Sequence, residues 1–228
     1  MNERWNTYVV GNSNRDAHVV LTDILETPGK MNPVILWGPS ATGKTKMVED
    51  FAGAIKATGK TVCKKTYEEI IREMLNDIHN DDAKVYREKY HLYDYVIIDD
   101  LQFLVAKEST QWELTEFFDE LITAGVQVVL VSSLSITNLS VIEEWSRSKG
   151  TATVIELLLP DIKMKEKALI AMSAKMNSNV PDEVIDYVSM RCKDFRRLEG
   201  GMHSILARRR VFNEQITVEL AEAVLSDK

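Results

Sequence analysis

The chain has 228 residues, with 28 Lys and Arg against 35 Asp and Glu, and a formal net charge of −7 at pH 7. Its 45% of hydrophobic residues exclude a disordered chain, and its 10 Gly and 5 Pro exclude collagen-like and linker-dominated classes. The acidic balance disfavours a non-specific coat on DNA, because binding to phosphates of that kind needs a basic domain.

Up to residue 160 the chain alternates short apolar runs with longer helical patterns. Runs rich in β-branched residues predict strands at Asn32–Trp37, Thr61–Cys63, Tyr95–Ile98, Val126–Ser132 and Thr153–Leu158. Apolar residues three or four positions apart predict helices at Thr45–Ala57, Tyr67–Ile78 and Ser109–Ala124. This alternation predicts βαβ units around a parallel sheet, and runs that are apolar on both faces are typical of its buried strands.

The pattern changes after Pro160, where no further strand is indicated. Four helices are predicted, at Asp161–Asn177, from Pro181 onward, at Arg196–Arg209 and at Thr217–Leu225. Asp161 is a favoured N-cap residue, and acidic residues follow Pro181 as they do in the first turn of a helix. We therefore expect two domains, an α/β core at 1–160 and a small all-helical domain at 161–228.

Membrane, secretory and disulfide classes find no support. No apolar run approaches the roughly 20 residues of a membrane span, and the N-terminal segment MNERWNTYVV lacks the apolar region of a signal peptide. Cys63 and Cys192 lie far apart without the spacing of metal ligands, which disfavours a disulfide framework and a zinc site. The expected location is the cytoplasm.

The strongest chemical signal is the segment GPSATGKT at 38–45, which matches G-x-x-x-x-G-K-[ST] between a predicted strand and a predicted helix. Its glycines let the backbone wrap a polyphosphate, Lys44 places a positive charge on the β- and γ-phosphates, and the Thr45 hydroxyl binds Mg²⁺. The candidate nucleotide contacts are Gly38, Pro39, Ser40, Ala41, Thr42, Gly43, Lys44, Thr45 and Lys46.

The second signal is the strand VIIDD at 96–100, which ends in two carboxylates in the Walker B arrangement. Asp99 is expected to hold Mg²⁺, directly or through water. Asp100 is expected to orient or deprotonate the attacking water, as phosphoryl transfer requires. The alternative is an ordinary strand end with two solvated Asp side chains. Together the two motifs predict ATP and Mg²⁺ as ligands.

Several segments resemble the AAA+ domain of the bacterial replication initiator family DnaA. They are VVGNSNRDAH at 9–18, YREKY at 86–90, DDLQFLVAKESTQ at 99–111 and RRLEG at 196–200, and the likeness runs over essentially the whole chain. The resemblance implies a P-loop NTPase fold, with a three-layer αβα core around a parallel sheet and a helical lid. It also implies an ATP-binding switch in the initiation of DNA replication that assembles with itself when ATP is bound.

The resemblance assigns roles to further residues. Val9, Val10 and Asn12 would line the adenine pocket, although an N-terminal strand packed on the core is the alternative for this segment. Arg196 matches the sensor 2 arginine, which reaches from the lid to the γ-phosphate. Lys107 falls in a segment that lies near single-stranded DNA in the family, and Tyr67–Tyr90 matches an extra helical insertion.

Two departures from the family bear on catalysis. Leu134 stands where the family has an Asp after the Ser pair of the sensor strand, so Ser133 is the nearest polar substitute. Lys149 occupies the arginine-finger position, with Arg147 two residues earlier. A finger is worth about 10³–10⁵ in rate, and Lys lacks the planar fork of Arg. We therefore expect a weak ATPase whose catalytic candidates are Asp100, Lys44, Arg196, Lys149 and Arg147.

The expected partners are ATP or ADP, and a second copy or a full-length initiator through AAA+ contacts. Single-stranded DNA and the replicative helicase are further candidates, whereas a domain that reads duplex DNA is not expected. Two other functions stay open, a helicase loader of the related AAA+ clade and an ATP-binding regulatory adaptor with little hydrolysis. The segments VGNSNRDAH and DFRRLEG favour the initiator over the loader, and Lys149 and Leu134 favour the adaptor.

Overall fold

The computed structural model describes residues 8–79 and 88–226. Part of the expected insertion Tyr67–Tyr90, and Tyr86 of the YREKY segment, lie outside these residues. The chain divides into two compact units, and each is described by itself. The first comprises Met1–Tyr8, Asp16–Ser40 and Lys44–Leu157, and the second comprises Val9–Arg15, Ala41–Gly43 and Leu158–Lys228.

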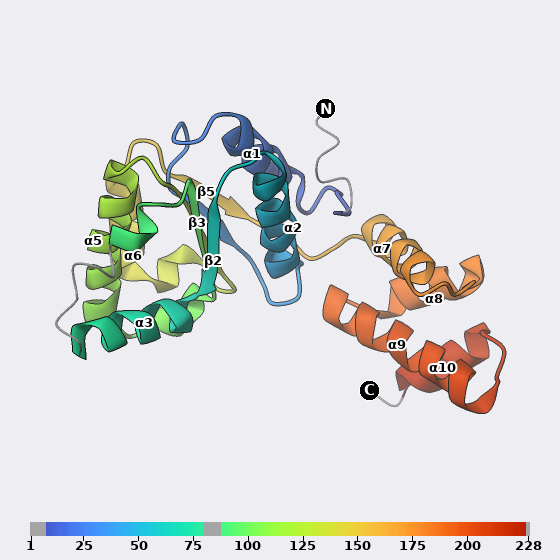
Figure 1. Ribbon diagram of the computed structural model, residues 1–228. Coiled ribbons are helices and arrows are strands. Elements are labelled where there is room, and N and C mark those ends of the chain that lie inside the picture. The colour runs from blue at the N-terminus through green and yellow to red at the C-terminus, as the bar shows by residue number, and fades with distance from the viewer. Residues whose placement is uncertain (1–7, 80–87, 227–228) are drawn as a thin grey trace. The chain divides into compact units, whose positions relative to one another are not determined.

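The first unit is built on a five-stranded parallel sheet with the strand order β2-β3-β4-β1-β5 (Figure 1). The strands are β1 (Val34–Trp37), β2 (Val62–Thr66), β3 (Tyr95–Asp99), β4 (Gln127–Ser132) and β5 (Thr153–Glu156). β3 and β4 are buried along their whole length. In the edge strand β5 only Ile155 is buried and Val154 is 44% exposed, so the expectation of two apolar faces is wrong for this strand.

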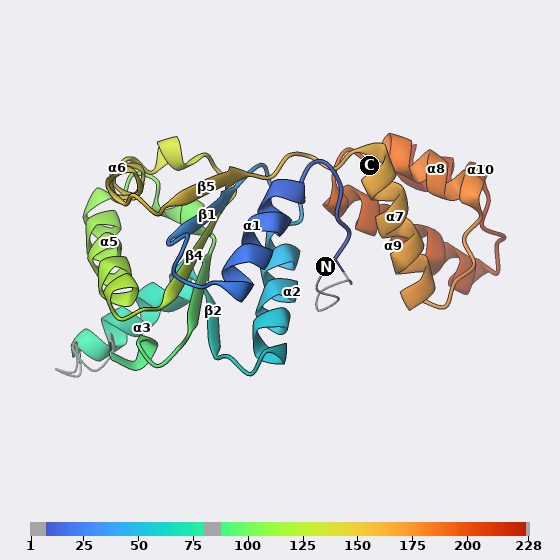
Figure 2. The same cartoon turned by 90° about the horizontal axis from the view of Figure 1, so that it is seen from above.

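Helices cover both faces of the sheet, with α1 and α2 on one side and α3, α5 and α6 on the other (Figures 1 and 2). Tyr95 of β3 shows the packing on the first side. The centres of its ring and of the Phe51 ring in α2 lie 6.0 Å apart in an edge-on contact, and its hydroxyl donates to the carbonyl of Ile24 in α1 at 2.8 Å. Burial raises the pKa of Tyr95 to about 12. On the other side Phe118 of α5 packs against Trp145 of α6 at 5.4 Å. The expected three-layer αβα fold is confirmed.

The helices of the first unit whose bounds lie within the described residues are α1 (Arg15–Glu26), α2 (Lys44–Ala57), α3 (Tyr67–His79), α5 (Glu108–Thr123) and α6 (Ser140–Ser148), with short 3₁₀ turns η2 (Leu101–Leu104) and η3 (Ile136–Asn138). The strands and helices predicted in this part form within a few residues of their expected ends. The helices α1 and α6 were not predicted. The signal for α1 is nevertheless present, because its buried residues have helical spacing at Ala17, Leu21, Ile24 and Leu25.

The second unit contains four helices within the described residues, α7 (Ile162–Lys175), α8 (Asp182–Arg191), α9 (Phe195–Phe212) and α10 (Val218–Ser226) (Figure 2). Their buried side chains form an apolar core. Asp161 caps α7 as expected, since its carboxylate accepts from the Met164 N–H at 2.8 Å. Asp194 caps α9 in the same way through the Arg197 N–H at 2.9 Å. The second unit takes in the chain from Leu158 onward, and the domain ranges 1–160 and 161–228 stay a prediction.

No helix within residues 8–79 and 88–226 is long and apolar enough to cross a membrane. Cys63 and Cys192 are both buried. Burial raises the pKa of the Cys63 thiol, so this side chain behaves as a small core residue.

The buried side chain of Asn32, just before β1, joins β1 to β4. Its amide donates to the Val126 carbonyl at 2.8 Å, and its oxygen accepts from the Val128 N–H at 2.9 Å. Asn32→Ala leaves both backbone groups buried without this partner, which should lower the free energy of unfolding by roughly 2–4 kcal/mol. Urea unfolding followed by tryptophan fluorescence measures the loss. Asn138→Ala, at an exposed position, is the control, and equal losses in the two variants would contradict the assignment.

Candidate functional site

The loop between β1 and α2 has a backbone that only glycine permits at two positions. Gly38 has a φ of 155°, and a Cβ there would lie 2.1 Å from the carbonyl oxygen of Leu157. Gly43 has a φ of 94°, in the left-handed region that side chains disfavour. Because α2 begins at Lys44, the positive end of its helix dipole lies at this loop. The loop therefore has the backbone form and the polarity of an anion-binding site.

The Lys44 side chain folds back into this loop and is buried. Its ammonium donates to the carbonyl of Gly38 at 2.6 Å and to that of Pro39 at 2.8 Å. Desolvation by burial lowers the pKa of Lys44 to about 8, although the charges of Asp99 and Asp100 favour the protonated form. A polyphosphate on the loop would add negative charge beside the ammonium and so favour its charged form.

Asp99, at the end of β3, lies against the beginning of α2. The Thr45 hydroxyl donates to its carboxylate at 2.9 Å, and the Asp100 N–H donates to the other oxygen at 2.8 Å. Burial raises the pKa of Asp99, while these two hydrogen bonds act in the opposite direction. The structure thus brings Lys44, Thr45 and Asp99 together, as the two sequence motifs predict.

This pair of oxygen ligands fits Mg²⁺. A carboxylate and a hydroxyl are hard ligands, and Mg²⁺ in nucleotide sites takes its remaining ligands from water and phosphate. In the part of the chain that the structure describes, no group of three or more His, Cys, Asp and Glu side chains forms a complete metal cage. Thr45 and Asp99 would therefore hold the ion together with the nucleotide.

Asp100 follows at the point where the chain leaves β3, with a left-handed φ of 66° that Asp tolerates better than most residues. Its carboxylate accepts from the Gln102 side-chain amide at 2.7 Å. The Gln102 oxygen in turn accepts from the Ser133 backbone N–H at 3.0 Å. Sequence reasoning missed Gln102, because its role depends on the adjacency of β3 and β4. Ser133, the expected substitute at the sensor position, contributes its backbone to this link.

The adenine candidates belong to the second unit. Val9 and Val10 are half-buried, Asn12 is exposed, and no strand forms there. The turn is instead shaped by Asn14, which donates to the Val9 carbonyl at 3.0 Å and accepts from the Gly11 N–H at 2.9 Å. Asn14 is buried and was not among the predicted residues.

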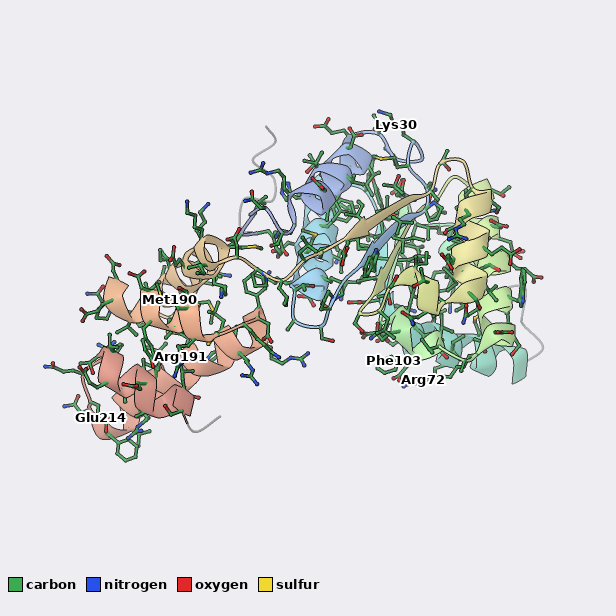
Figure 3. All side chains as sticks on the ribbon, turned by 180° about the vertical axis from the view of Figure 1, so that it is seen from behind. Lys30, Arg72, Phe103, Met190, Arg191 and Glu214 are labelled. Carbon is green, nitrogen blue, oxygen red and sulfur yellow. The ribbon has the colours of Figure 1, made fainter. Side chains whose placement is uncertain are left out.

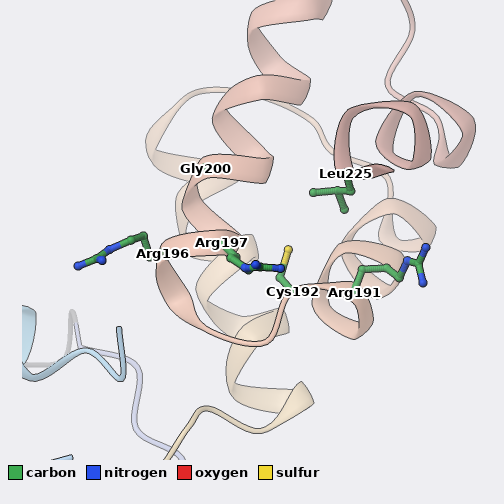
Figure 4. A pocket seen from close by; sticks show the side chains of 6 residues that line it. All are labelled: Arg191, Cys192, Arg196, Arg197, Gly200 and Leu225. Carbon is green, nitrogen blue, oxygen red and sulfur yellow. The ribbon is translucent and has the colours of Figure 1, made fainter. Parts of the chain in front are cut away.

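Arg196 lies in the first turn of α9, where its side chain is exposed. Figure 4 shows it reaching away from Arg197 and Cys192, although all three border one cavity of about 330 Å³. The Phe195 N–H, one residue earlier, donates to the carbonyl of Ala41 at 3.2 Å. Thus the second unit joins the first turn of α9 to the tip of the glycine-rich loop.

The remaining cationic candidates form ion pairs within the first unit. The Lys149 ammonium lies 2.6 Å from the Asp119 carboxylate and 5.7 Å from the centre of the Trp145 ring. Arg147 pairs with Glu143 at 2.6 Å and keeps 75% of its side chain exposed. Lys46 pairs with Asp50 one turn along α2. Arg147 is thus the more accessible of the two finger candidates.

Lys107 occupies an exposed loop before α5. Its ammonium lies 3.2 Å from the Tyr67 hydroxyl and 5.3 Å from the centre of that ring. Phe103, 51% exposed, and Arg72 of α3 lie at the same edge of the first unit in the view of Figure 3. In that view (Figure 3) a cationic side chain and an exposed aromatic ring share one edge of the first unit.

Comparisons with known proteins point to one family. A family model described as the bacterial DnaA ATPase domain matches residues 1–155. The chromosomal replication initiator protein DnaA of Caldanaerobacter subterraneus subsp. tengcongensis is 31% identical over 98% of this chain and 52% of its own length. The chain thus spans about half the length of that relative.

Solved structures of DnaA proteins also resemble the chain. Domain III of the Thermotoga maritima replication initiation protein DnaA has a TM-score of 0.87, with 24% identity over 100% of this chain and 98% of its own. A structure of the replication initiator DnaA bound to AMPPCP and single-stranded DNA has a TM-score of 0.77, with 28% identity over 90% of this chain and 65% of its own. The first supports the fold, and the second adds ligands that are features of that relative.

Because Lys44 is buried, the stability of the folded protein should depend on pH. Its pKa is about 8 in the folded protein against an ordinary 10.5, so between these values the unfolded chain binds a proton that the folded chain does not. The stability of the wild type should therefore rise with pH in this window, by up to about 3 kcal/mol relative to Lys44→Met, which lacks the titrating group. Urea unfolding at a series of pH values measures both proteins, and parallel profiles would contradict the depressed pKa.

Proposed function

Because the chain belongs to the family of the bacterial DnaA ATPase domain, we propose that it is an ATP-binding switch that acts in the initiation of DNA replication. The observation that carries the proposal is the loop of Gly38 and Lys44 beside the Thr45–Asp99 pair, whose hydroxyl and carboxylate are 2.9 Å apart. The loop suits a polyphosphate, and the Thr45–Asp99 pair suits Mg²⁺. The likeness to a relative bound to AMPPCP supports the same ligand for this chain.

Each candidate residue has a place in this proposal. The backbone N–H groups of the loop 38–45 bind the phosphates, apart from Pro39, which has none. Lys44 lies on the β- and γ-phosphates, and Pro39, Ser40, Ala41, Thr42 and Lys46 lie around them. Thr45 and Asp99 hold Mg²⁺, which neutralises charge on the phosphate oxygens when bound. Val9, Val10 and Asn12 line the adenine, and Arg196 senses the γ-phosphate from the lid.

Hydrolysis of ATP in this proposal is slow. Asp100 orients the attacking water, but a second subunit must supply the stabilising cation, as in shared AAA+ sites. Lys149 carries that charge on a single ammonium, and its contacts with Asp119 and Trp145 must break first. These contacts also favour the second candidate, a regulatory adaptor that binds ATP with little turnover.

The partners follow from the same family. We propose self-association, or association with a full-length initiator, and contact with single-stranded DNA and the replicative helicase in the cytoplasm. The single-stranded DNA bound to the 28% identical relative supports the DNA contact, and Lys107 with the exposed Phe103 supplies a cation and a ring for stacking. The chain is acidic overall, so this contact is local and weakens as salt rises.

The central test is nucleotide binding by calorimetry with ATP and Mg²⁺. Lys44→Ala removes the ammonium that faces the β- and γ-phosphates, so binding should be lost while the circular dichroism spectrum stays unchanged. Lys56→Ala, an exposed lysine at the other end of α2, is the matched control and should bind as the wild type does. Unchanged affinity in Lys44→Ala would show that the site lies elsewhere.

A second test measures what Lys149, at the arginine-finger position, contributes to the ATPase rate. The ATPase rate per molecule of the wild type should barely rise with protein concentration, and Lys149→Arg should raise it by at least about tenfold, because Arg spreads its charge over the γ-phosphate oxygens. Arg147→Ala should lower assembly more than chemistry. Lys175→Arg, on the exposed side of α7, is the control. A wild-type rate that climbs about tenfold on assembly, with no gain from Lys149→Arg, would contradict the assignment.

A further inference from the structure

We propose that Gln102 is a positioning residue that holds the Asp100 carboxylate against the end of β4. The inference rests on the proposed function, in which Asp100 orients the attacking water. Gln102 lies in η2, directly after the turn at Asp100. Its side chain makes two hydrogen bonds, one to Asp100 at 2.7 Å and one from the Ser133 N–H at 3.0 Å.

The chemistry of the amide allows one orientation of this side chain. Its Nε2 carries the hydrogens that a carboxylate accepts, and its Oε1 accepts from the backbone N–H. Rotation of the amide by half a turn would place the oxygen against the Asp100 carboxylate and the NH₂ group against the Ser133 N–H. Both contacts would then be repulsive. The bond to Asp100 is also charge-assisted, which makes it the stronger kind of hydrogen bond.

The position of Gln102 beyond the paired ends of β3 and β4 explains why its two hydrogen bonds matter. β3 and β4 pair in parallel from Tyr95 with Gln127 to Ile98 with Leu130, and the backbone pairing goes no further in the described strands. Asp100 and Ser133 both lie beyond this last pair. Gln102 therefore continues the connection between the two strands by a side chain, at the edge where the candidate catalytic groups lie.

Asp100 needs such support because its backbone has turned away from β3. With a φ of 66° and a ψ of 33°, it starts η2 in the left-handed region. The Phe103 N–H closes this turn on the Asp100 carbonyl at 3.3 Å. The turn fixes the backbone, whereas the direction of the carboxylate is fixed by Gln102.

The hydrogen-bonded link from Asp100 through Gln102 to Ser133 also supplies a polar contact that Leu134 cannot make. An apolar side chain at that position, 42% exposed, makes no polar contact with a phosphate or with a carboxylate. The Ser132 hydroxyl accepts from the Leu134 N–H at 3.1 Å, which steadies the segment that presents the Ser133 N–H. A displacement of residues 132–134 is thus transmitted to Asp100 through Gln102.

Two substitutions separate a positioning role from a merely structural one. Gln102→Met keeps the length of the side chain and removes both hydrogen bonds. Gln102→Glu keeps an acceptor for the Ser133 N–H but sets a second carboxylate against Asp100. The matched control is Gln111→Met, because buried Gln111 also bridges two backbone groups, donating to Leu104 at 2.9 Å and accepting from Val141 at 3.2 Å.

The first readout needs no nucleotide. In the proton–nitrogen correlation spectrum of the free protein, Asp100→Asn should shift the Ser133 amide signal when made in the wild type and in Gln111→Met. The same change in Gln102→Met should leave that signal in place. An equal response in all three backgrounds overturns the proposal.

The second readout is single-site turnover of ATP. Both Gln102 variants should lose roughly tenfold to 100-fold in kcat, with ATP affinity within about twofold of the wild type, because a displaced catalytic group costs rate and leaves ground-state binding intact. Gln111→Met should keep its kcat. Full turnover in Gln102→Glu would overturn the proposal. A wild type that binds ATP without turnover would refute hydrolysis in the proposed function, and the amide signal would still decide the role of Gln102.

Discussion

The structure of the site depends on the burial of one positive charge, the ammonium of Lys44. Moving an ammonium out of water is costly unless polar partners replace the water. Here the carbonyls of Gly38 and Pro39 supply direct contacts, and the charges of Asp99 and Asp100 stabilise the protonated form. These partners do not compensate fully, since the pKa still falls to about 8. The site therefore gains from any anion that the loop can admit.

The strand order explains why the other groups lie near this charge. In a parallel sheet all the carboxyl ends of the strands meet at one edge, where ligands bind in open α/β folds. β1 lies between β4 and β5, and β4 lies next to β3, so the loops after β1, β3 and β4 share this edge. Residues far apart in sequence, Lys44, Asp99 and Ser133, are therefore presented on the same side of the first unit.

The sequence predicted the parts of the site that depend on local pattern. The loop at 38–45 needs glycines at fixed spacing, and the Walker B segment needs an apolar run before two carboxylates, so both are visible in a single chain. The strands and most helices follow from periodicity in the same way. The helix α6 was not predicted, although its buried residues Val141, Ile142 and Trp145 have helical spacing.

The features that the sequence did not predict depend on which residues lie close together in the folded chain. The role of Gln102 depends on β4 lying beside β3, and its spacing from Asp100 carries no signal of its own. The pairing of Lys149 with Asp119 depends in the same way on the packing of α6 against α5. Likewise β5 could not be recognised as an edge strand from an apolar run, because its exposure follows from the strand order.

The contacts of Lys149 bear on the slow hydrolysis that we propose for this chain. Asp119 accepts from the Lys149 ammonium and also from the Trp145 ring N–H at 2.9 Å, so the carboxylate is held while the cation lies over the ring. In the proposed assembly, a phosphate on a neighbouring subunit would have to compete with Asp119 for the Lys149 ammonium. Lys also meets the phosphate with one ammonium, whereas Arg offers a planar fork. In the proposed function both effects would slow hydrolysis and prolong the ATP-bound form, which suits a switch better than a motor.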